Sequence, residues 1–221
     1  MKRLYPLAYY PIFLNIYKRR CVVVGGGEVA LRKVRALLEQ GATVQVITPA
    51  LCSELSCLAE SKAINVLQRS YEPGDLKGAY IAIAATTETE TNKRVAMEAK
   101  RRGILVNVVD DLERSDFIVP SCLRRGELTI AVSTAGKSPA LARKIRTRLE
   151  KDLVEEYASL VALIGEVRSE LRQQGITVNK NAWQKALDLD SLIEMLRAGQ
   201  SKKAKATLLN NLERLRQTEV K

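Results

Sequence analysis

A run of apolar residues that ends in three glycines constrains this chain more than any other stretch. Residues 20–30 are Arg-Cys-Val-Val-Val-Gly-Gly-Gly-Glu-Val-Ala, and apolar residues at helical spacing continue to residue 38. A buried strand, a glycine turn and a helix form the first half of a dinucleotide-binding βαβ unit. Gly25 permits the tight turn, Gly27 lets the backbone approach a pyrophosphate, and Ala30 allows close helix–strand packing. The alternative is a sharp strand-to-helix turn that binds nothing.

Further strands and helices alternate along the first half of the chain. Strands are expected at 21–24, 43–47, 64–68, 80–84 and 104–109, and helices at 28–40, 52–61 and 90–101. Alternation at these lengths predicts an α/β fold with a Rossmann-type, doubly wound parallel sheet. Residues 1–19 are expected to lead into it and to end in a strand edge at 12–16.

The pattern changes after residue 111. Residues 117–120 and 128–133 are expected to pair as strands about a turn at 124–126, and a helix follows at 140–151. Ser138 suits the N-cap of that helix and Pro139 its first position. Further helices are expected at 153–173, 181–197 and 201–217. We therefore predict an NAD-binding Rossmann domain at 1–113, a small α+β dimerisation and substrate-binding segment at 114–150, and a C-terminal helical domain at 151–221.

Composition narrows the functional class. With 46% hydrophobic and 28% charged residues, the chain is typical of soluble globular proteins, and no apolar run is long enough for a membrane span. Lys2 and Arg3 precede a stretch broken by two prolines, so we expect no signal peptide and a cytoplasmic protein. The four cysteines lack zinc-site spacing and histidine is absent, which predicts structural thiols and no metal site.

The net charge of +11 favours either a nucleic acid or a small polyanion as partner. Residues 114–150 contain eight Lys and Arg against three Asp and Glu, a net charge of +5. This cluster lacks interleaved aromatic residues beyond Phe117 and has no known nucleic-acid-binding motif. We therefore expect no nucleic-acid partner and favour an acidic small molecule.

Ligands of open α/β sheets bind beyond the carboxyl ends of the strands. Here those ends carry the glycine turn, Thr48, Thr86 and Asp110. The second strand lacks both the acidic residue that often holds an NAD ribose and an arginine for a 2′-phosphate, so we favour NAD. Asp110 could accept a proton while a nicotinamide accepts hydride; the alternative is that Asp110 or Asp111 only begins a turn.

Five motifs occur in an order typical of one enzyme family. They are Gly-Gly-Gly-Glu-Val-Ala at 25–30, Ile-Ala-Ala-Thr at 83–86, Asn-Val-Val-Asp at 107–110, Phe-Ile-Val-Pro-Ser at 117–121 and Ala-Val-Ser-Thr-Ala-Gly-Lys-Ser-Pro-Ala-Leu-Ala-Arg at 131–143. From about residue 9 to 149 the chain resembles the precorrin-2 dehydrogenase/sirohydrochlorin ferrochelatase family. That module forms the N-terminal part of fused siroheme synthases and also exists alone. Residues 151–221 match the family only in being helical.

The resemblance implies a homodimer that oxidises precorrin-2 to sirohydrochlorin with NAD⁺, and leaves open whether it also inserts Fe²⁺ as a second substrate. It implies that Asp110 is the catalytic residue and that Asn107 contacts or orients the substrate. Thr134 replaces a serine that can be phosphorylated in some fused members, so such regulation is not expected here. Five basic residues would bind the acetate and propionate carboxylates of the tetrapyrrole, namely Arg124, Arg125, Lys137, Arg143 and Lys144. Arg146 and Arg148 are expected instead to lie on a solvated helix face.

Together, the strand ends and the resemblance define the expected site. The cofactor contacts are Gly25, Gly26, Gly27, Glu28, Val29, Thr48, Pro49, Ala50 and Thr86. The substrate contacts are Asn107, Ser133, Thr134, Lys137 and Arg143. The main alternative is a regulatory Rossmann module that senses NAD without turnover.

Overall fold

The computed structural model describes residues 9–152 and 154–219. The chain divides into two compact units, Met1–Val119 (unit 1) and Pro120–Lys221 (unit 2), and each is described by itself. The first eight residues of the expected lead-in and Leu153, the first residue of the expected helix 153–173, lie outside the described residues.

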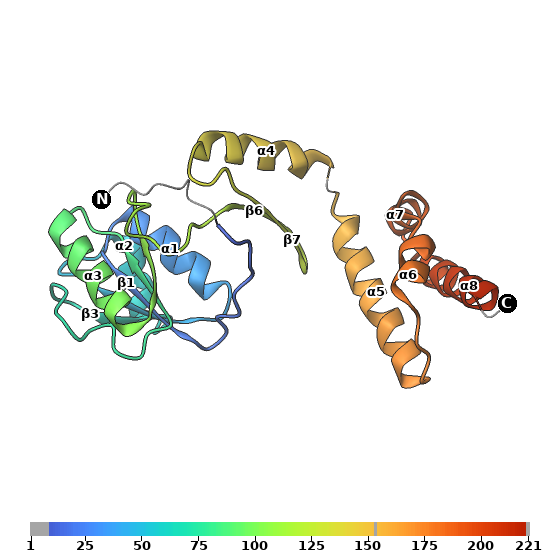
Figure 1. The fold of residues 1–221 in the computed structure, drawn as a ribbon, viewed down its shortest axis with the longest axis horizontal. Helices are drawn as coiled ribbons and strands as arrows, with labels where there is room; N and C mark the ends of the chain where they lie inside the picture. Colours follow the sequence, from blue (N-terminus) through green and yellow to red (C-terminus); the bar gives the residue numbers. More distant parts are fainter. Residues whose placement is uncertain (1–8, 153, 220–221) are drawn as a thin grey trace. The chain divides into compact units, whose positions relative to one another are not determined.

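Unit 1 is built on a five-stranded parallel sheet in the order β3-β2-β1-β4-β5. Figure 1 shows β1 and β3 of this sheet with the helices that flank it. Its strands are β1 (Arg20–Val24), β2 (Thr43–Ile47), β3 (Asn65–Leu67), β4 (Ile81–Ala84) and β5 (Leu105–Val108). The helices are α1 (Glu28–Leu38), α2 (Ser53–Glu60) and α3 (Thr89–Arg102). This order confirms the doubly wound Rossmann-type fold. The strand order reverses between β1 and β4, and ligands of such sheets bind at the carboxyl edge beside that reversal.

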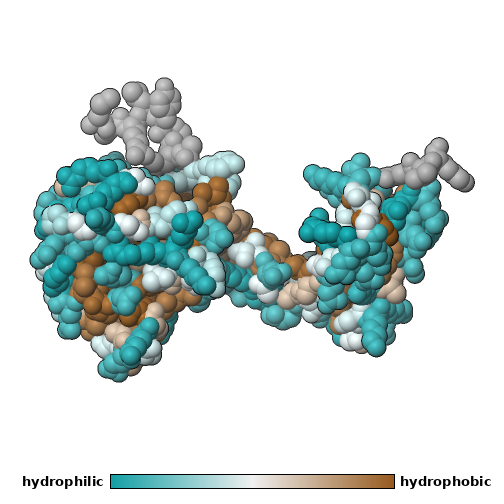
Figure 2. Space-filling view, turned by 90° about the horizontal axis from the view of Figure 1, so that it is seen from below, coloured by the Kyte–Doolittle hydropathy of each residue, from teal (hydrophilic) through white to brown (hydrophobic). Residues whose placement is uncertain are grey.

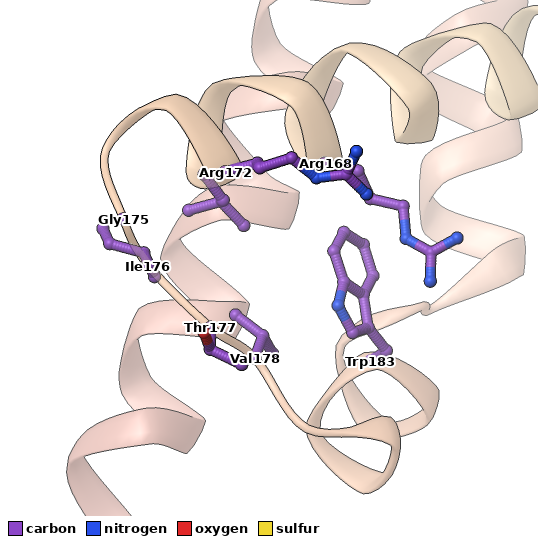
Figure 3. Close-up of a pocket in the computed structure, with 8 residues that line it drawn as sticks. Arg168, Arg172, Gly175, Ile176, Thr177, Val178 and Trp183 are labelled. Carbon is purple, nitrogen blue, oxygen red and sulfur yellow. The ribbon is translucent and has the colours of Figure 1, made fainter.

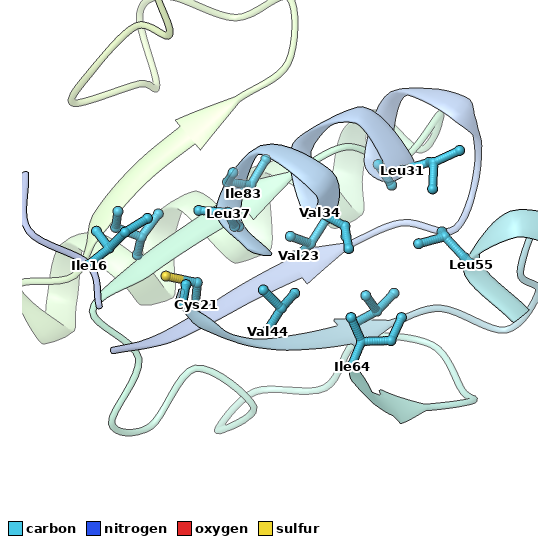
Figure 4. Packing of buried hydrophobic residues seen from close by; sticks show 14 residues of the cluster. Ile16, Cys21, Val23, Leu31, Val34, Leu37, Val44, Leu55, Ile64 and Ile83 are labelled. Atoms are coloured by element: carbon cyan, nitrogen blue, oxygen red, sulfur yellow. The ribbon is translucent and has the colours of Figure 1, made fainter. Parts of the chain in front are cut away.

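Both faces of the sheet are buried, as parallel sheets require. Cys21 and Val23 of β1 point to the face covered by α1, whereas Val22 and Val24 point to the opposite face. Figure 4 shows Val34 of α1 packed over β1 among the buried side chains of the first face. Burial raises the pKa of the Cys21 thiol to about 11, which agrees with its expected role as a small apolar side chain.

Unit 2 begins with an antiparallel hairpin and continues as helices. The elements are β6 (Ser121–Arg125), β7 (Leu128–Val132), α4 (Pro139–Asp152), α5 (Glu156–Gln173), α6 (Lys180–Ala186), α7 (Leu189–Arg197) and α8 (Ser201–Glu219). The Leu141 amide donates to Oγ of Ser138 at 3.2 Å, which confirms the predicted N-cap. The four helices α5, α6, α7 and α8 share a separate apolar core, which includes Leu160, Leu192 and Leu208.

Three details differ from the sequence-based expectation. The first hairpin strand is 121–125 instead of 117–120, because Pro120 has no N–H for a strand ladder and Phe117 packs against the core of unit 1. Residues 12–16 form no strand. The single helix expected at 181–197 is two helices, because the Asp188 carboxylate caps α7 by accepting from the Ser191 amide at 3.4 Å. The three-part domain division stays a prediction.

None of the helices in residues 9–152 and 154–219 is long and apolar enough to cross a membrane.

Candidate active site

The first two glycines of the turn are needed for packing within unit 1. Gly25 has a φ of +132°, and a Cβ there would overlap the carbonyl oxygen of Ala85 at the end of β4. A Cβ on Gly26 would overlap the carbonyl oxygen of Ala50 and lie 2.6 Å from Oγ1 of Thr48. Glycine therefore lets the β1–α1 turn touch the loops that follow both neighbouring strands.

The third glycine has a different environment. A Cβ on Gly27 would meet nothing within 4 Å, and the residue is the N-cap of α1 without any side-chain capping hydrogen bond. Glu28 and Val29 form the first turn of α1, where backbone N–H groups have no helical acceptor. Open space in front of such N–H groups fits the pyrophosphate of a dinucleotide.

The loop after β2 presents backbone to the same edge. Thr48 is buried, and its hydroxyl donates to the carbonyl oxygen of Ala50 at 2.7 Å. Pro49 and Ala50 are exposed. Thr48 therefore secures the loop internally, while Pro49 and Ala50 carry its accessible surface.

The loop after β4 is held by a residue that sequence reasoning missed. Nδ2 of Asn92 donates to the Thr86 carbonyl oxygen at 2.9 Å, and the Thr86 hydroxyl lies 2.9 Å from Oδ1 of Asn92. The Glu88 amide also donates to that hydroxyl at 3.1 Å. Thr86 thus shapes the loop, and no sequence signal distinguishes Asn92 from the other polar residues of α3.

Asp110 lies at the tip of the loop after β5 in an uncommon backbone conformation. It is exposed and has a φ of +59°, a region that aspartate enters more readily than most residues. Ser115 fixes this loop: its buried hydroxyl accepts from the Val108 amide at 2.9 Å and donates to the Asp111 carbonyl oxygen at 2.7 Å. Sequence reasoning missed Ser115.

The two neighbouring aspartates have different partners. Asp111 forms an ion pair with Arg114 and accepts from the Arg114 amide at 3.0 Å. Burial would raise the pKa of Asp111, but these Arg114 contacts outweigh it and lower that pKa. The Asp110 carboxylate makes no hydrogen bond or ion pair with the residues described for the chain. Asp111 therefore stabilises the turn, and Asp110 is accessible to a ligand.

Asn107 lies on β5, three residues before Asp110, and is nearly fully buried. Its Nδ2 donates to the carbonyl oxygen of Phe117 at 3.1 Å. This bond ties the returning chain to the sheet near Asp110. Its contact with a substrate stays a prediction.

The remaining predicted substrate residues lie together in unit 2, around the loop that begins α4. The Thr134 hydroxyl accepts from the Ser138 amide at 3.0 Å, and Oγ of Ser133 accepts from the Ala135 amide at 3.1 Å. Lys137 and Arg143 are exposed beside them. The structure thus places the cofactor residues, Asn107 and Asp110 on unit 1 and the other four residues on unit 2.

A hollow of about 290 Å³ occurs in the C-terminal helices (Figure 3). Its lining residues are Arg168, Leu171, Arg172, Gly175, Ile176, Thr177, Val178 and Trp183. The guanidinium of Arg168 lies 5.2 Å from the centre of the Trp183 ring. The hollow contains none of the residues predicted for the cofactor or substrate. Within the described ranges, no three His, Cys, Asp or Glu residues are grouped to hold a metal ion.

Two family models match successive parts of the chain. Residues 12–121 match the model described as "Putative NAD(P)-binding", and residues 125–152 match "Sirohaem biosynthesis protein central". The first covers the glycine turn and Asp110, and the second covers Lys137 and Arg143.

Curated relatives and a solved structure extend these matches. The chain is 42% identical over 184 residues to a siroheme synthase of Chromobacterium violaceum, covering 82% of this chain and 39% of that protein. It is 40% identical over 209 residues to a siroheme synthase of Nitrosococcus oceani, covering 94% and 44%. The chain thus spans about four-tenths of the length of these relatives. A structure of "SirC, precorrin-2 dehydrogenase" superposes with a TM-score of 0.69 at 24% identity, covers 93% of this chain and 100% of that one, and supports the fold.

Proposed function

Because the chain belongs to the siroheme-biosynthesis family of these relatives, we propose that it oxidises precorrin-2 to sirohydrochlorin with NAD⁺. The family relationship and the shared fold support this function, which we assign to the two matched regions at residues 12–121 and 125–152. The neighbour with the same fold carries the name of this dehydrogenase.

The observation that carries the proposal is the position of Asp110. Its accessible carboxylate lies beyond β5 at the carboxyl edge of the sheet, the edge that also carries the glycine turn. The oxidation removes one hydride and one proton from precorrin-2, giving sirohydrochlorin, NADH and H⁺. Bound NAD⁺ supplies the hydride acceptor. Asp110 accepts the proton as general base, for which its exposed carboxylate is accessible.

The cofactor is bound by backbone groups in this proposal. Gly27 and the first N–H groups of α1 receive the pyrophosphate, while Pro49 and Ala50 border the adenosine ribose. The loop of residues 48–52 contains no basic side chain to neutralise a 2′-phosphate, which supports NAD over NADP.

The tetrapyrrole carboxylates require cationic partners. Lys137 and Arg143 are exposed, and each offers charge-assisted hydrogen bonds to an acetate or propionate group. Asn107, Ser133 and Thr134 complete the proposed set of substrate contacts.

The active form proposed here is a cytoplasmic homodimer. Leu141 and Ile145 of α4 are 50% and 39% exposed. Hydrophobic residues also reach the surface in patches among hydrophilic ones in Figure 2. Burial of such side chains against a second copy would favour association. Analytical ultracentrifugation tests this: a dimer mass supports it, and a monomer at assay concentrations contradicts it.

The test of the function is anaerobic turnover of enzymatically generated precorrin-2, followed by NADH absorbance and the sirohydrochlorin spectrum. NADH and sirohydrochlorin rising together with NAD⁺, and less with NADP⁺, is the expected result. Asp110→Asn keeps the shape of the side chain and tolerates the positive φ, so the Kd for NAD⁺ should be unchanged. Because an amide does not serve as a general base, kcat should fall by about 10²- to 10⁴-fold. Near-normal kcat in this variant would remove Asp110 from catalysis.

NAD⁺ binding without any turnover would instead support the sensing module. Adding Fe²⁺ to the completed reaction tests the second substrate, because metal insertion changes the sirohydrochlorin spectrum to that of siroheme.

A further inference from the structure

The hollow in the C-terminal helices is formed by the turn between α5 and α6. Gly175, with a φ of +69°, follows the last turn of α5 and redirects the chain. Asn179 then begins α6, because its side chain accepts from the Ala182 amide at 2.8 Å. The chain between these two points and Trp183 of α6 border a space of about 290 Å³ (Figure 3). Pockets that bind small organic molecules begin at about this size.

Two arginines form one wall of the hollow. Arg168 and Arg172 lie four residues apart on α5, so they occupy the same face of that helix. Both are exposed, and Figure 3 shows their side chains extending from α5 towards Trp183. Within the described ranges, neither guanidinium forms an ion pair or a hydrogen bond. Like charges at this spacing repel each other, and a bound anion would relieve that repulsion.

The acidic residues of α5 pair with other cations. Glu166 and Glu170 form ion pairs with Lys205 of α8 at 3.8 and 3.0 Å. Glu156, in the first turn of α5, pairs with Arg197 of α7 at 3.1 Å. Among the described residues, those that line the hollow include no acidic one. The fold therefore leaves the two arginines of the wall available to an external anion.

The remainder of the hollow suits a flat apolar group. Leu171 is nearly fully buried and Val178 is half-buried, so they supply an apolar floor. The Arg168 guanidinium lies 5.2 Å from the centre of the half-buried Trp183 ring, within the range of a cation–π contact. A guanidinium that stacks on an aromatic ring keeps the N–H groups of its edge for a carboxylate.

We propose that this hollow is a binding site for a small planar carboxylate, a flat ring that carries at least one carboxylate group. The ring packs against Trp183 and the apolar floor, and the carboxylate accepts hydrogen bonds from Arg168 and Arg172. A free aromatic acid has this chemistry, and so does one carboxylated pyrrole ring at the rim of a tetrapyrrole. The lining shares no residue with the proposed catalytic, cofactor and substrate set, so the inference does not rest on the proposed function.

A titration followed at Trp183 tests the site in the full chain. Trp183 is the only tryptophan, so its indole N–H gives one reporter signal in a ¹H–¹⁵N NMR spectrum. Phthalate, a ring with two carboxylates, should shift this signal with a Kd of about 1 mM, the strength expected of a ligand with about a dozen non-hydrogen atoms. Benzamide has the ring without the charge and acetate has the charge without the ring. Each should therefore bind about tenfold more weakly or worse.

Three variants locate the binding. Arg172→Gln removes one guanidinium and should weaken phthalate binding about tenfold or more, as expected for a lost hydrogen bond to a charged group. Arg168→Lys keeps the charge but loses the planar fork, so it should also bind more weakly. The matched control is Arg216→Gln, because Arg216 is exposed on α8 and does not line the hollow. Its Kd should equal that of the unsubstituted protein.

A structural role of the arginines is tested separately. Arg172 lies in the last turn of α5, where a cation interacts favourably with the helix dipole, so its loss can lower the Tm. Measuring the Kd well below the Tm of each variant separates binding from stability. If one arginine variant does not fold, the other still tests the wall.

Several results would overturn the inference. These are the absence of a saturable shift with phthalate, equal affinity for benzamide or acetate, and an unchanged Kd in Arg172→Gln. Competition distinguishes the two sources of the ligand: displacement of phthalate by sirohydrochlorin assigns the site to the rim of a tetrapyrrole, and its failure assigns the site to a free aromatic acid. The titration needs no turnover of precorrin-2, so failure of the proposed function would leave this inference standing.

Discussion

Gly27→Ala and Gly26→Ala should change different properties, although the residues are adjacent: the first should weaken NAD⁺ binding and the second should lower stability. The added Cβ of Gly27→Ala meets no protein atom within 4 Å, but it occupies the space proposed for the pyrophosphate. The added Cβ of Gly26→Ala overlaps the Ala50 carbonyl oxygen, whether a cofactor is bound or not. The pair therefore separates a glycine needed for the ligand from a glycine needed for the fold.

The magnitudes follow from these surroundings. In Gly27→Ala, the loss of a favourable N-cap residue costs about 1 kcal/mol of unfolding free energy. The reduced entropy of the unfolded chain returns about 0.4–1 kcal/mol, so the net change should be close to zero. Gly26→Ala must displace backbone, which should cost about 1–3 kcal/mol. Binding of NAD⁺ to Gly27→Ala should weaken tenfold or more, about 1.4 kcal/mol.

Denaturation with and without NAD⁺ measures both effects. At a concentration 100 times its Kd, NAD⁺ should stabilise the unsubstituted protein by about 2.7 kcal/mol. The same concentration should stabilise Gly27→Ala by about 1.4 kcal/mol or less, because it is then at most ten times the new Kd. Isothermal titration calorimetry gives the Kd values directly. An unaltered Kd in Gly27→Ala would refute pyrophosphate binding at this turn, and a fully stable Gly26→Ala would refute the packing argument.

Further substitutions test the loop of Asp110 and the two cores. Ser115→Ala should cost about 1–3 kcal/mol on urea denaturation and should lower kcat without changing the Kd for NAD⁺, because the loop holding Asp110 loses its buried hydrogen bonds. Burial would raise the pKa of Glu98, but its hydrogen bonds, first that from Tyr71, lower it below the usual 4.5. The stability that Glu98 contributes is therefore complete above pH 4.5 and is lost as the pH falls through the lower folded-state pKa. In urea denaturation, the unfolding free energy of Glu98→Gln should consequently depend less on pH between pH 7 and pH 3. Leu208→Ala should cost the helical part of unit 2 about 2–5 kcal/mol and leave the Kd for NAD⁺ unchanged, as measured by denaturation and calorimetry; a changed Kd would contradict separate cores.

Local sequence sufficed for the Rossmann elements because each has a short-range cause. The β-branched run at 21–24 suits a strand buried on both faces, and the apolar spacing after residue 28 suits one face of a helix. Ser138 and Pro139 likewise specify the start of α4 by themselves. Where a local signal was weak, as around Asp188, the prediction merged two helices into one.

The sequence by itself therefore determined the type and order of the elements from β1 to β5 and the place of the glycine turn. The tertiary structure decided which glycine serves packing, because the atoms that crowd Gly26 come from the loop after β2. It also distinguished Asp110 from Asp111, because the conformation of the turn after β5 pairs Asp111 with Arg114 and leaves Asp110 exposed. Periodicity records which residues are apolar, whereas the crowding of Gly26 depends on how segments that are distant in the sequence meet in space.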